Sequence, residues 1–165
     1  MRPAFKVPPG YAAKRAMEPR EEAADLESAG RDPEGREVLL EAAAAAAWAG
    51  MAEAARKDGV TLLAVSGFRS IRRQEELIAR KLAAGEGVEA VLRVMAAPGY
   101  SEHHTGRAVD IATPGEPALT EDFERTEAFR WLGRRARNHG FTMSYPRGNP
   151  HGMAYEPWHW FHGRR

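Results

Sequence analysis

Residues 101–111 read SEHHTGRAVDI, a polar segment with two histidines that runs into a short apolar strand. Side chains of a strand alternate between its two faces, so Ala108 and Asp110 share one face while Val109 and Ile111 share the other. We expect the two β-branched residues to fasten the strand to the core. The carboxylate of Asp110 then lies beside a small side chain, which leaves room for a metal ion and its water.

A second cluster, YEPWHWFH at residues 155–162, lies near the end of the sequence. Glu156 and His159 are three residues apart, a spacing that sends them to opposite faces of a regular strand. Both can serve one site only if the backbone bends between them. Pro157 makes such a bend reasonable, because it restricts the backbone and cannot donate to a strand ladder.

The sequence contains no cysteine, which removes disulfides, thiolate nucleophiles and cysteine zinc sites from consideration. Any metal must therefore be bound by nitrogen and oxygen atoms. Two histidines and one carboxylate, with a fourth position for water, are a standard catalytic zinc arrangement. Residue chemistry alone does not choose among the six histidines.

A third candidate segment, SGFRSIRRQ at residues 66–74, lies where a buried strand is expected to lead into a helix. Arg69 emerges at the end of that strand, and Gln74 lies one turn into the helix. A guanidinium at this place can clamp a carboxylate or stabilise a developing oxyanion. Taken by itself, however, such an arginine is more often a surface ion-pair residue.

Hydrophobic spacing and the positions of glycine and proline predict the rest of the fold. The expected helices span residues 34–57, 70–83, 88–95 and 125–138, with Ser70 and Thr126 as N-caps. The expected strands span residues 60–66, 108–112, 141–145 and 155–161. Helices come first and most strands come late, which favours an α+β fold. We expect a small, mainly antiparallel sheet that carries the metal site and packs against several helices.

At 165 residues the chain has the size of one ordinary domain. Residues 1–33 are rich in proline and charge, so we expect an N-terminal arm or loops there and a single domain over residues 34–165. Lysine and arginine (24) nearly balance aspartate and glutamate (23). This balance gives no electrostatic reason to expect nucleic acid or an anionic membrane as a partner.

The longest apolar stretch is too short to cross a bilayer, so we expect no membrane span. The N-terminus lacks the apolar core of a secretion signal. The default location is therefore the cytoplasm, or outside the membrane if a leader has been removed. We expect a monomer.

Together, the three segments resemble the zinc D-alanyl-D-alanine carboxypeptidases of the VanY type, within a wider group that includes D-Ala-D-Ala dipeptidases and L-alanyl-D-glutamate endopeptidases. The family pattern Ser-x-His-x-x-Gly-x-Ala-x-Asp is matched in residues 101–110, and Glu-x-x-His is matched in residues 156–159. The upstream pattern Ser-Gly-Phe-Arg-Ser-x-x-x-Gln is matched in residues 66–74. The resemblance covers residues 60–160 in the family's order and spacing.

The resemblance implies a single Zn²⁺ ion and assigns its ligands by motif position to His103, Asp110 and His159. It implies that Glu156 is the general acid/base and that Arg69 supports the substrate carboxylate or the transition state. Further substrate contacts are expected at Ser101, Gln74 and Trp158. His104, His139, His151 and His162 are expected to be ordinary surface or core residues.

The implied function is that of a zinc metallopeptidase of the carboxypeptidase type, which hydrolyses D-Ala-D-Ala bonds of peptidoglycan stem peptides or muropeptides. Three other activities on the same polymer stay open: an L,D-carboxypeptidase, a D-Ala-D-Ala dipeptidase and an L-alanyl-D-glutamate endopeptidase. A non-catalytic wall-binding domain that keeps zinc for structure is the alternative from another class. The presence of Glu156 argues against that alternative.

Overall fold

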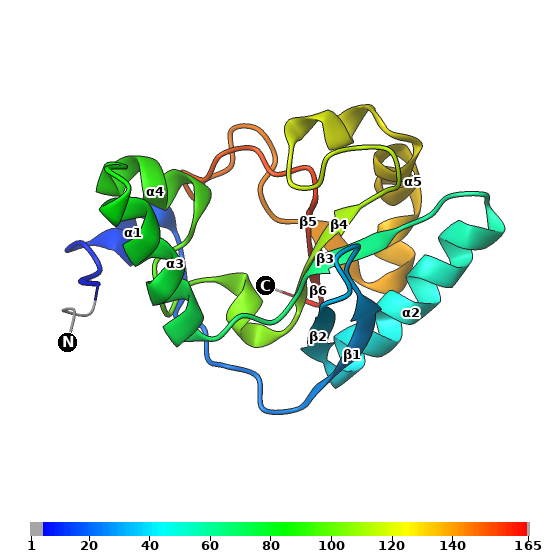
Figure 1. The fold of residues 1–165 in the computed structure, drawn as a ribbon, viewed down its shortest axis with the longest axis horizontal. Coiled ribbons are helices and arrows are strands. Elements are labelled where there is room, and N and C mark those ends of the chain that lie inside the picture. Colours follow the sequence, from blue (N-terminus) through cyan, green and yellow to red (C-terminus); the bar gives the residue numbers. More distant parts are fainter. Residues whose placement is uncertain (1–4, 165) are drawn as a thin grey trace.

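The computed structural model describes residues 5–164, and a small antiparallel sheet lies at its centre (Figure 1). Its four strands follow the order β3-β4-β6-β5. Their bounds are β3 Leu63–Ser66, β4 Ala108–Ala112, β6 His159–His162 and β5 Phe141–Met143. A separate hairpin pairs β1 (Leu26–Arg31) with β2 (Glu37–Glu41). The expected α+β class with a small antiparallel sheet is confirmed.

Strand β4 is an inner strand of the sheet, and all of its residues are buried. Val109 and Ile111 belong to the main hydrophobic core, as their alternation predicts. Asp110 pairs with Ser66 of β3 on one side and with His159 of β6 on the other. The register of the sheet therefore places two of the expected metal ligands directly opposite each other.

The five α-helices of the described chain are α1 Tyr11–Arg15, α2 Ala42–Lys57, α3 Ile71–Ala83, α4 Val88–Val94 and α5 Glu127–Arg135. Three 3-10 helices are η1 Glu102–Thr105, η2 Glu121–Arg125 and η3 Ala136–His139. The hydroxyl of Ser70 accepts a hydrogen bond from the backbone of Arg73 and caps α3. Thr126 caps α5 in the same way, so both expected N-caps are confirmed.

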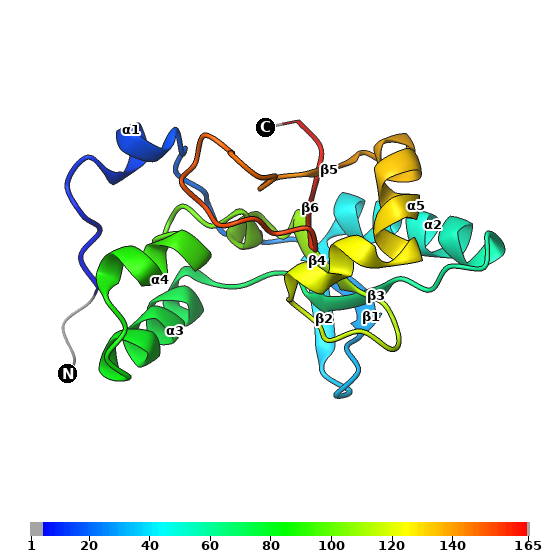
Figure 2. The same cartoon turned by 90° about the horizontal axis from the view of Figure 1, so that it is seen from above.

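Two hydrophobic clusters hold the elements together. The larger one packs the sheet against α2 and α5, while the smaller one joins α1, α3 and α4 to Tyr145 and Met153. Figures 1 and 2 show the two groups of helices at opposite ends of the molecule, with the sheet between them. The candidate site draws its side chains from both groups of elements, with Gln74 on α3 and Asp110 and His159 on the sheet.

The helix expected over residues 34–57 begins only at Ala42, because residues 37–41 form β2. Leu40 is buried as expected, but on a strand. Apolar residues recur at helical spacing on both sides of the boundary between β2 and α2, so spacing alone does not reveal where the strand ends and the helix begins. The boundary expected between residues 33 and 34 falls in the turn of the β1-β2 hairpin.

Three strands are shorter than expected. The strand predicted over residues 141–145 ends at Met143. The strand predicted over residues 60–66 begins at Leu63, and the last strand, predicted from residue 155, begins at His159. A turn precedes His159, whose backbone N–H donates to the carbonyl of Glu156 at 3.2 Å. This turn supplies the bend at Pro157 that the two site residues require.

Residues 5–25 form a largely irregular segment, which we call the N-terminal strap. Its Arg20 N–H donates to the carbonyl of Gly99 at 2.7 Å, and its Ala23 N–H donates to that of His104 at 2.9 Å. The carboxylate of Glu22 accepts from the first backbone N–H of α3 at 2.6 Å. The strap therefore ties down the segment that leads into η1, which carries His103.

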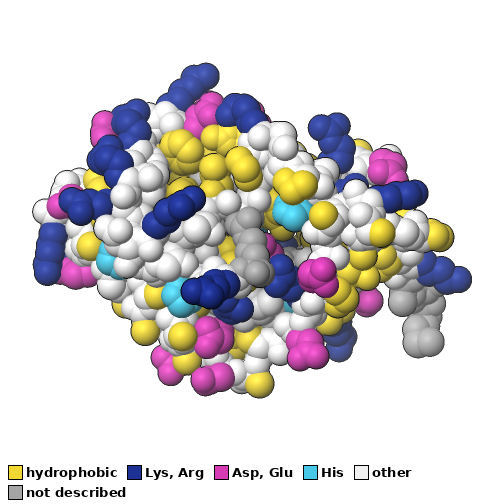
Figure 3. All heavy atoms as spheres, turned by 180° about the vertical axis from the view of Figure 1, so that it is seen from behind, with side chains coloured by type: hydrophobic (Ala, Val, Ile, Leu, Met, Phe, Trp, Pro, Cys, Tyr) yellow, Lys and Arg dark blue, Asp and Glu magenta, His cyan; other side chains and the backbone are white. Residues whose placement is uncertain are grey.

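On the face drawn in Figure 3, cationic and anionic side chains are interspersed, in keeping with the balanced composition. Within residues 5–164, no helix has the length and apolar character needed to cross a membrane.

Candidate active site

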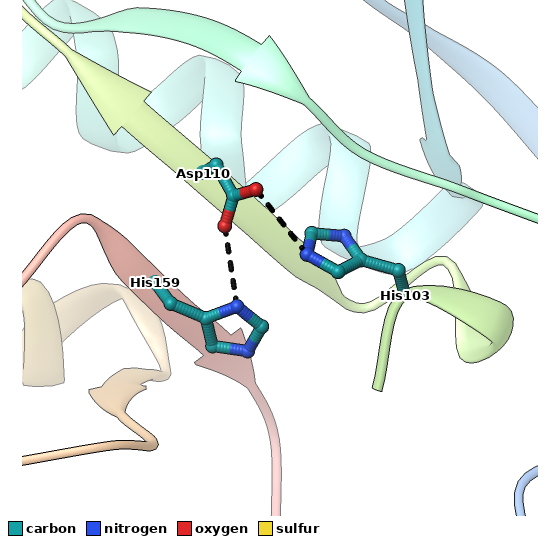
Figure 4. Close-up of side chains that lie close together, drawn as sticks. All are labelled: His103, Asp110 and His159. Atoms are coloured by element: carbon teal, nitrogen blue, oxygen red, sulfur yellow. Dashed lines mark hydrogen bonds and ion pairs between the residues drawn. The ribbon is translucent and has the colours of Figure 1, made fainter. Parts of the chain in front are cut away.

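His103, Asp110 and His159 converge at one buried point (Figure 4). His103 comes from η1, Asp110 from the middle of β4 and His159 from the start of β6. Nε2 of His103 lies 3.3 Å from Oδ2 of Asp110, and Nδ1 of His159 lies 3.2 Å from Oδ1. One donor atom from each side chain lies within 4.8 Å of the others, so the three residues fit a single metal ion.

The outer nitrogen of each histidine is hydrogen bonded to an oxygen. Nδ1 of His103 lies 2.7 Å from the carbonyl of Gly67, and Nε2 of His159 lies 2.9 Å from a carboxylate oxygen of Glu102. With the ring protons at these outer positions, the lone pairs of the other two nitrogens face Asp110. Two imidazoles and a carboxylate so arranged suit Zn²⁺ in chemistry and in orientation.

The pKa values of His159 and Asp110 are shifted in opposite directions by their contacts. Burial alone would lower the pKa of His159, but its hydrogen bonds to Asp110 and Glu102 raise it to about 10. Burial alone would raise the pKa of Asp110, but His103 and His159 hold it well below its usual range. Asp110 is therefore ionised and His159 protonated at neutral pH, and a metal cation replaces the proton.

Glu156 adds a second carboxyl beside this cluster. Its Oε2 lies 3.6 Å from Nδ1 of His159, and its backbone N–H donates to the carbonyl of Tyr145 at 3.0 Å. Burial is the main reason that the pKa of Glu156 is raised to about 7. A carboxyl that titrates near neutrality can both accept and return a proton, which is the property a general acid/base needs.

Arg69 lies on the wall of the same site, half-buried rather than free in solvent. Its guanidinium donates to Oε1 of Gln74 at 3.0 Å and to the hydroxyl of Ser66 at 3.3 Å. The Gln74 amide donates in turn to the carbonyl of Ala96 at 2.7 Å. Two neutral partners therefore hold the cation in place without cancelling its charge.

A cavity of about 480 Å³ opens over these groups. It contains every residue that the sequence proposed for the site: Arg69, Gln74, Ser101, His103, Asp110, Glu156, Trp158 and His159. Gln74 and Ser101 are almost fully buried. Ser101 accepts a hydrogen bond from the backbone of His103 at 3.3 Å. These two side chains thus also fix the positions of their neighbours.

Sequence reasoning did not propose Tyr145, which lines the cavity, or Glu102, which contacts His159 from behind. The ring of Tyr145 lies beside that of His159, tilted by 41° and with ring centroids 4.8 Å apart. Glu102 is buried behind His159 and occupies a position that the family pattern leaves open. An acidic residue directly before a candidate ligand histidine was the only sequence signal for Glu102. His104 is close by but bonds to the carbonyl of Arg69, so its role is structural.

The model of the VanY family, D-alanyl-D-alanine carboxypeptidase, matches residues 37–164. This chain belongs to the VanY family. The match takes in every candidate site residue and leaves out the N-terminal strap. The matched range also contains all three sequence patterns, in residues 66–74, 101–110 and 156–159.

Individual relatives of this VanY-family chain are similar to it in sequence and in fold. YodJ of Bacillus subtilis (strain 168), named as a carboxypeptidase, is 37% identical over 112 residues, which cover 66% of this chain and 41% of YodJ. The matches cover between 41% and 52% of the length of the curated relatives.

Two solved structures extend the comparison. The LD-carboxypeptidase LdcB superposes with a TM-score of 0.78 at 31% identity, covering 87% of this chain and 70% of LdcB. A mutant of the vancomycin-resistance D,D-pentapeptidase VanY, solved in complex with Zn(II), gives a TM-score of 0.67 at 28% identity. That match covers 88% of this chain and 82% of the other.

Proposed function

We propose that this VanY-family protein is a zinc-dependent carboxypeptidase that hydrolyses D-Ala-D-Ala type bonds in peptidoglycan stem peptides. The observation that carries the proposal is the position of Glu156, a buried carboxyl with a pKa of about 7 whose Oε2 lies 3.6 Å from a nitrogen of His159. A group able to move protons is therefore placed beside the candidate metal ligands. Family membership and the Zn(II) complex of a relative support the same conclusion.

In this proposal the zinc ion would be held by Nε2 of His103, a carboxylate oxygen of Asp110 and Nδ1 of His159. When bound there, zinc would act as a Lewis acid that polarises the carbonyl of the scissile bond and lowers the pKa of a bound water molecule. Glu156 accepts the proton of the attacking water at its carboxylate. It then returns the proton to the amine of the leaving amino acid, so that the carboxyl is regenerated in its starting form.

Arg69 is proposed to bind either the terminal carboxylate of the substrate or the oxyanion that develops on the scissile carbonyl. Its guanidinium is held by Gln74 and Ser66 and lines the cavity together with Glu156. Charge-assisted hydrogen bonds from such a fixed donor are stronger than those between neutral groups. Ser101 and Trp158, which line the same cavity, are proposed as further substrate contacts.

The proposed catalytic unit is a single chain, because every proposed site residue comes from it. The unit extends upstream of residue 34, since β1 pairs with β2 and the N-terminal strap bonds to Gly99 and His104. The proposed macromolecular partners are muropeptides, with no role for nucleic acid.

An L,D-carboxypeptidase is the second candidate, because LdcB aligns with 87% of this chain at a TM-score of 0.78. The two activities differ in the residue that precedes the released D-alanine. They share the metal site, the general acid/base and the need to bind a terminal carboxylate. A dipeptidase, an endopeptidase or a zinc-containing binding domain are the remaining alternatives.

The test is to incubate the zinc-loaded protein with defined muropeptides and to identify the products by mass spectrometry. A D,D-carboxypeptidase removes one D-alanine from a pentapeptide stem and leaves a tetrapeptide stem intact. An L,D-carboxypeptidase shortens the tetrapeptide stem, a dipeptidase cleaves free D-Ala-D-Ala, and the endopeptidase cuts after the first L-alanine. Glu156→Gln is the inactive control. If the zinc-loaded protein cleaves none of these substrates, the proposed function is wrong and the binding alternative replaces it.

A further inference from the structure

Glu102 is a buried charged residue for which the proposed mechanism has no task. It begins η1, directly before His103, and only 6% of its surface is exposed. Its Oε2 lies 2.9 Å from Nε2 of His159 and accepts a hydrogen bond from the hydroxyl of Ser144 at 2.5 Å. The carboxylate therefore lies against the side of the His159 ring that faces away from Asp110.

Orientation of a ring does not by itself require a charged acceptor. The outer nitrogen of His103 is served by a backbone carbonyl, that of Gly67, at 2.7 Å. The outer nitrogen of His159 is served by a carboxylate, although a buried carboxylate loses its hydration and must be compensated. A carboxylate behind a histidine does more than orient it, because it also makes the opposite nitrogen a stronger electron donor to a metal.

Ser144 contacts both Glu102 and His159. Ser144 follows β5 and is itself buried, and its backbone N–H donates to the carbonyl of His159 at 3.4 Å. One serine thus contacts both members of the pair, the histidine through its backbone and the glutamate through its side chain. Hydrogen bonds thus connect Ser144 to Glu102, Glu102 to His159, and His159 to Asp110 at the candidate metal position.

We propose that Glu102 is a positioning residue of the metal centre. It keeps the ring proton of His159 on Nε2 and thereby presents the lone pair of Nδ1 to the zinc ion beside His103 and Asp110. The inference rests on the proposed function only for the identity of the metal. It adds a charged side chain on which zinc affinity depends and which does not touch the ion.

The test is zinc affinity, measured by competition with a chromophoric chelator on purified full-length variants. Loss of such an outer partner costs about 10- to 100-fold in metal affinity. We expect Glu102→Ala to lie near the upper end of that range. We expect Glu102→Gln to lie near the lower end, about 10-fold, because its amide oxygen still accepts from the ring but carries no charge. The cobalt(II) absorption spectrum gives a second readout, and both variants should shift its ligand-field bands.

Asp32→Asn is the matched control, since Asp32 is also a buried, hydrogen-bonded carboxylate but lies in the β1-β2 turn. This control should lose stability and keep zinc affinity. If Glu102→Ala does not fold, the near-isosteric Glu102→Gln decides the matter. Zinc affinity within twofold of the wild type in the folded variant, with unchanged cobalt bands, would overturn the inference. Failure of the proposed function is distinct, because it shows as a wild type that binds zinc tightly and cleaves no muropeptide.

Discussion

Oε2 of Glu156 lies 3.6 Å from Nδ1 of His159, although a regular strand would hold residues at this spacing on opposite faces. The turn that ends at His159 brings the two side chains to one point. One short segment thus supplies both a candidate metal ligand and the candidate proton carrier. The two roles can be separated by substitution.

Glu156→Gln should keep zinc and lose turnover, because the amide keeps the shape of the side chain but cannot carry the proton. We expect kcat to fall by about 10²- to 10⁴-fold, the usual contribution of a general acid/base. His159→Ala should lose both zinc and activity. Metal analysis of the purified variants, paired with the muropeptide assay, checks the two outcomes. Full activity in Glu156→Gln would remove this residue from the mechanism.

Arg69→Met should lower kcat/KM by about 10²- to 10³-fold, the range seen when one oxyanion donor is removed. Arg69→Lys should recover little, because an ammonium lacks the planar fork of the guanidinium. Gln74→Leu should show a smaller loss, since Arg69 would remain but without its 3.0 Å hydrogen bond. The double variant should be no worse than Arg69→Met alone. Steady-state kinetics on the cleaved muropeptide test this, and additive losses would contradict a shared role.

Gly67→Ala should destabilise the fold and weaken the metal site together. A Cβ at residue 67 would collide with the backbone carbonyl of Leu39 on β2, which is hydrogen bonded to the next residue, Phe68. Overpacking of this kind costs about 1–3 kcal/mol in the free energy of unfolding. The displaced carbonyl of Gly67 would also lose its hydrogen bond to His103. Urea unfolding and zinc titration measure the two effects, and Gly133→Ala, with open space around it, is the control.

The contributions of Glu156 and His159 to the stability of the metal-free protein should each be lost as pH rises, in two separate windows. Glu156 binds its proton more tightly in the native state, so its contribution is complete below pH 4.5 and is lost as pH rises through about 7. His159 also binds its proton more tightly in the native state. Its contribution to stability is complete below pH 6.5 and is lost as pH rises through about 10. The free energy of unfolding, measured in urea at a series of pH values, checks this. In Glu156→Gln the loss of stability between pH 4.5 and about 7 should disappear, while the loss at higher pH should remain. Unchanged lower-window behaviour in that variant would contradict the assignment.

The same site predicts how zinc and protons compete. Zinc must displace the proton of His159, so the rise in Tm on adding zinc should grow as pH increases from 6 toward 9. Calorimetry in buffers of different ionisation enthalpy should record proton release on zinc binding. A zinc response independent of pH would mean that His159 is already neutral in the metal-free protein.

Much of the site could be predicted from sequence, because short motifs fix local geometry. The alternation in β4 correctly placed Val109 and Ile111 in the core, and Ser70 and Thr126 were correctly read as caps. The start of β2 was missed because apolar residues continue at helical spacing from the strand into α2.

Other features depend on contacts between distant parts of the chain. Glu102 meets His159 across 57 positions, and no local pattern marks that pairing. The hydrogen bonds of Gln74 to Arg69 and Ala96 depend equally on how α3 packs. Sequence therefore identified which residues gather in the cavity, while the fold shows which of them hold the others in place.

The N-terminal strap lies outside the region matched by the family model, which starts at residue 37. Its backbone N–H groups nonetheless donate hydrogen bonds to the carbonyls of Gly99 and His104, which precede and follow His103 in the sequence. A chain trimmed to the matched region would leave those carbonyls to water and the loop less constrained. A segment outside the matched region can thus influence metal affinity without contacting the ion, and it can be altered without any change to the ligands.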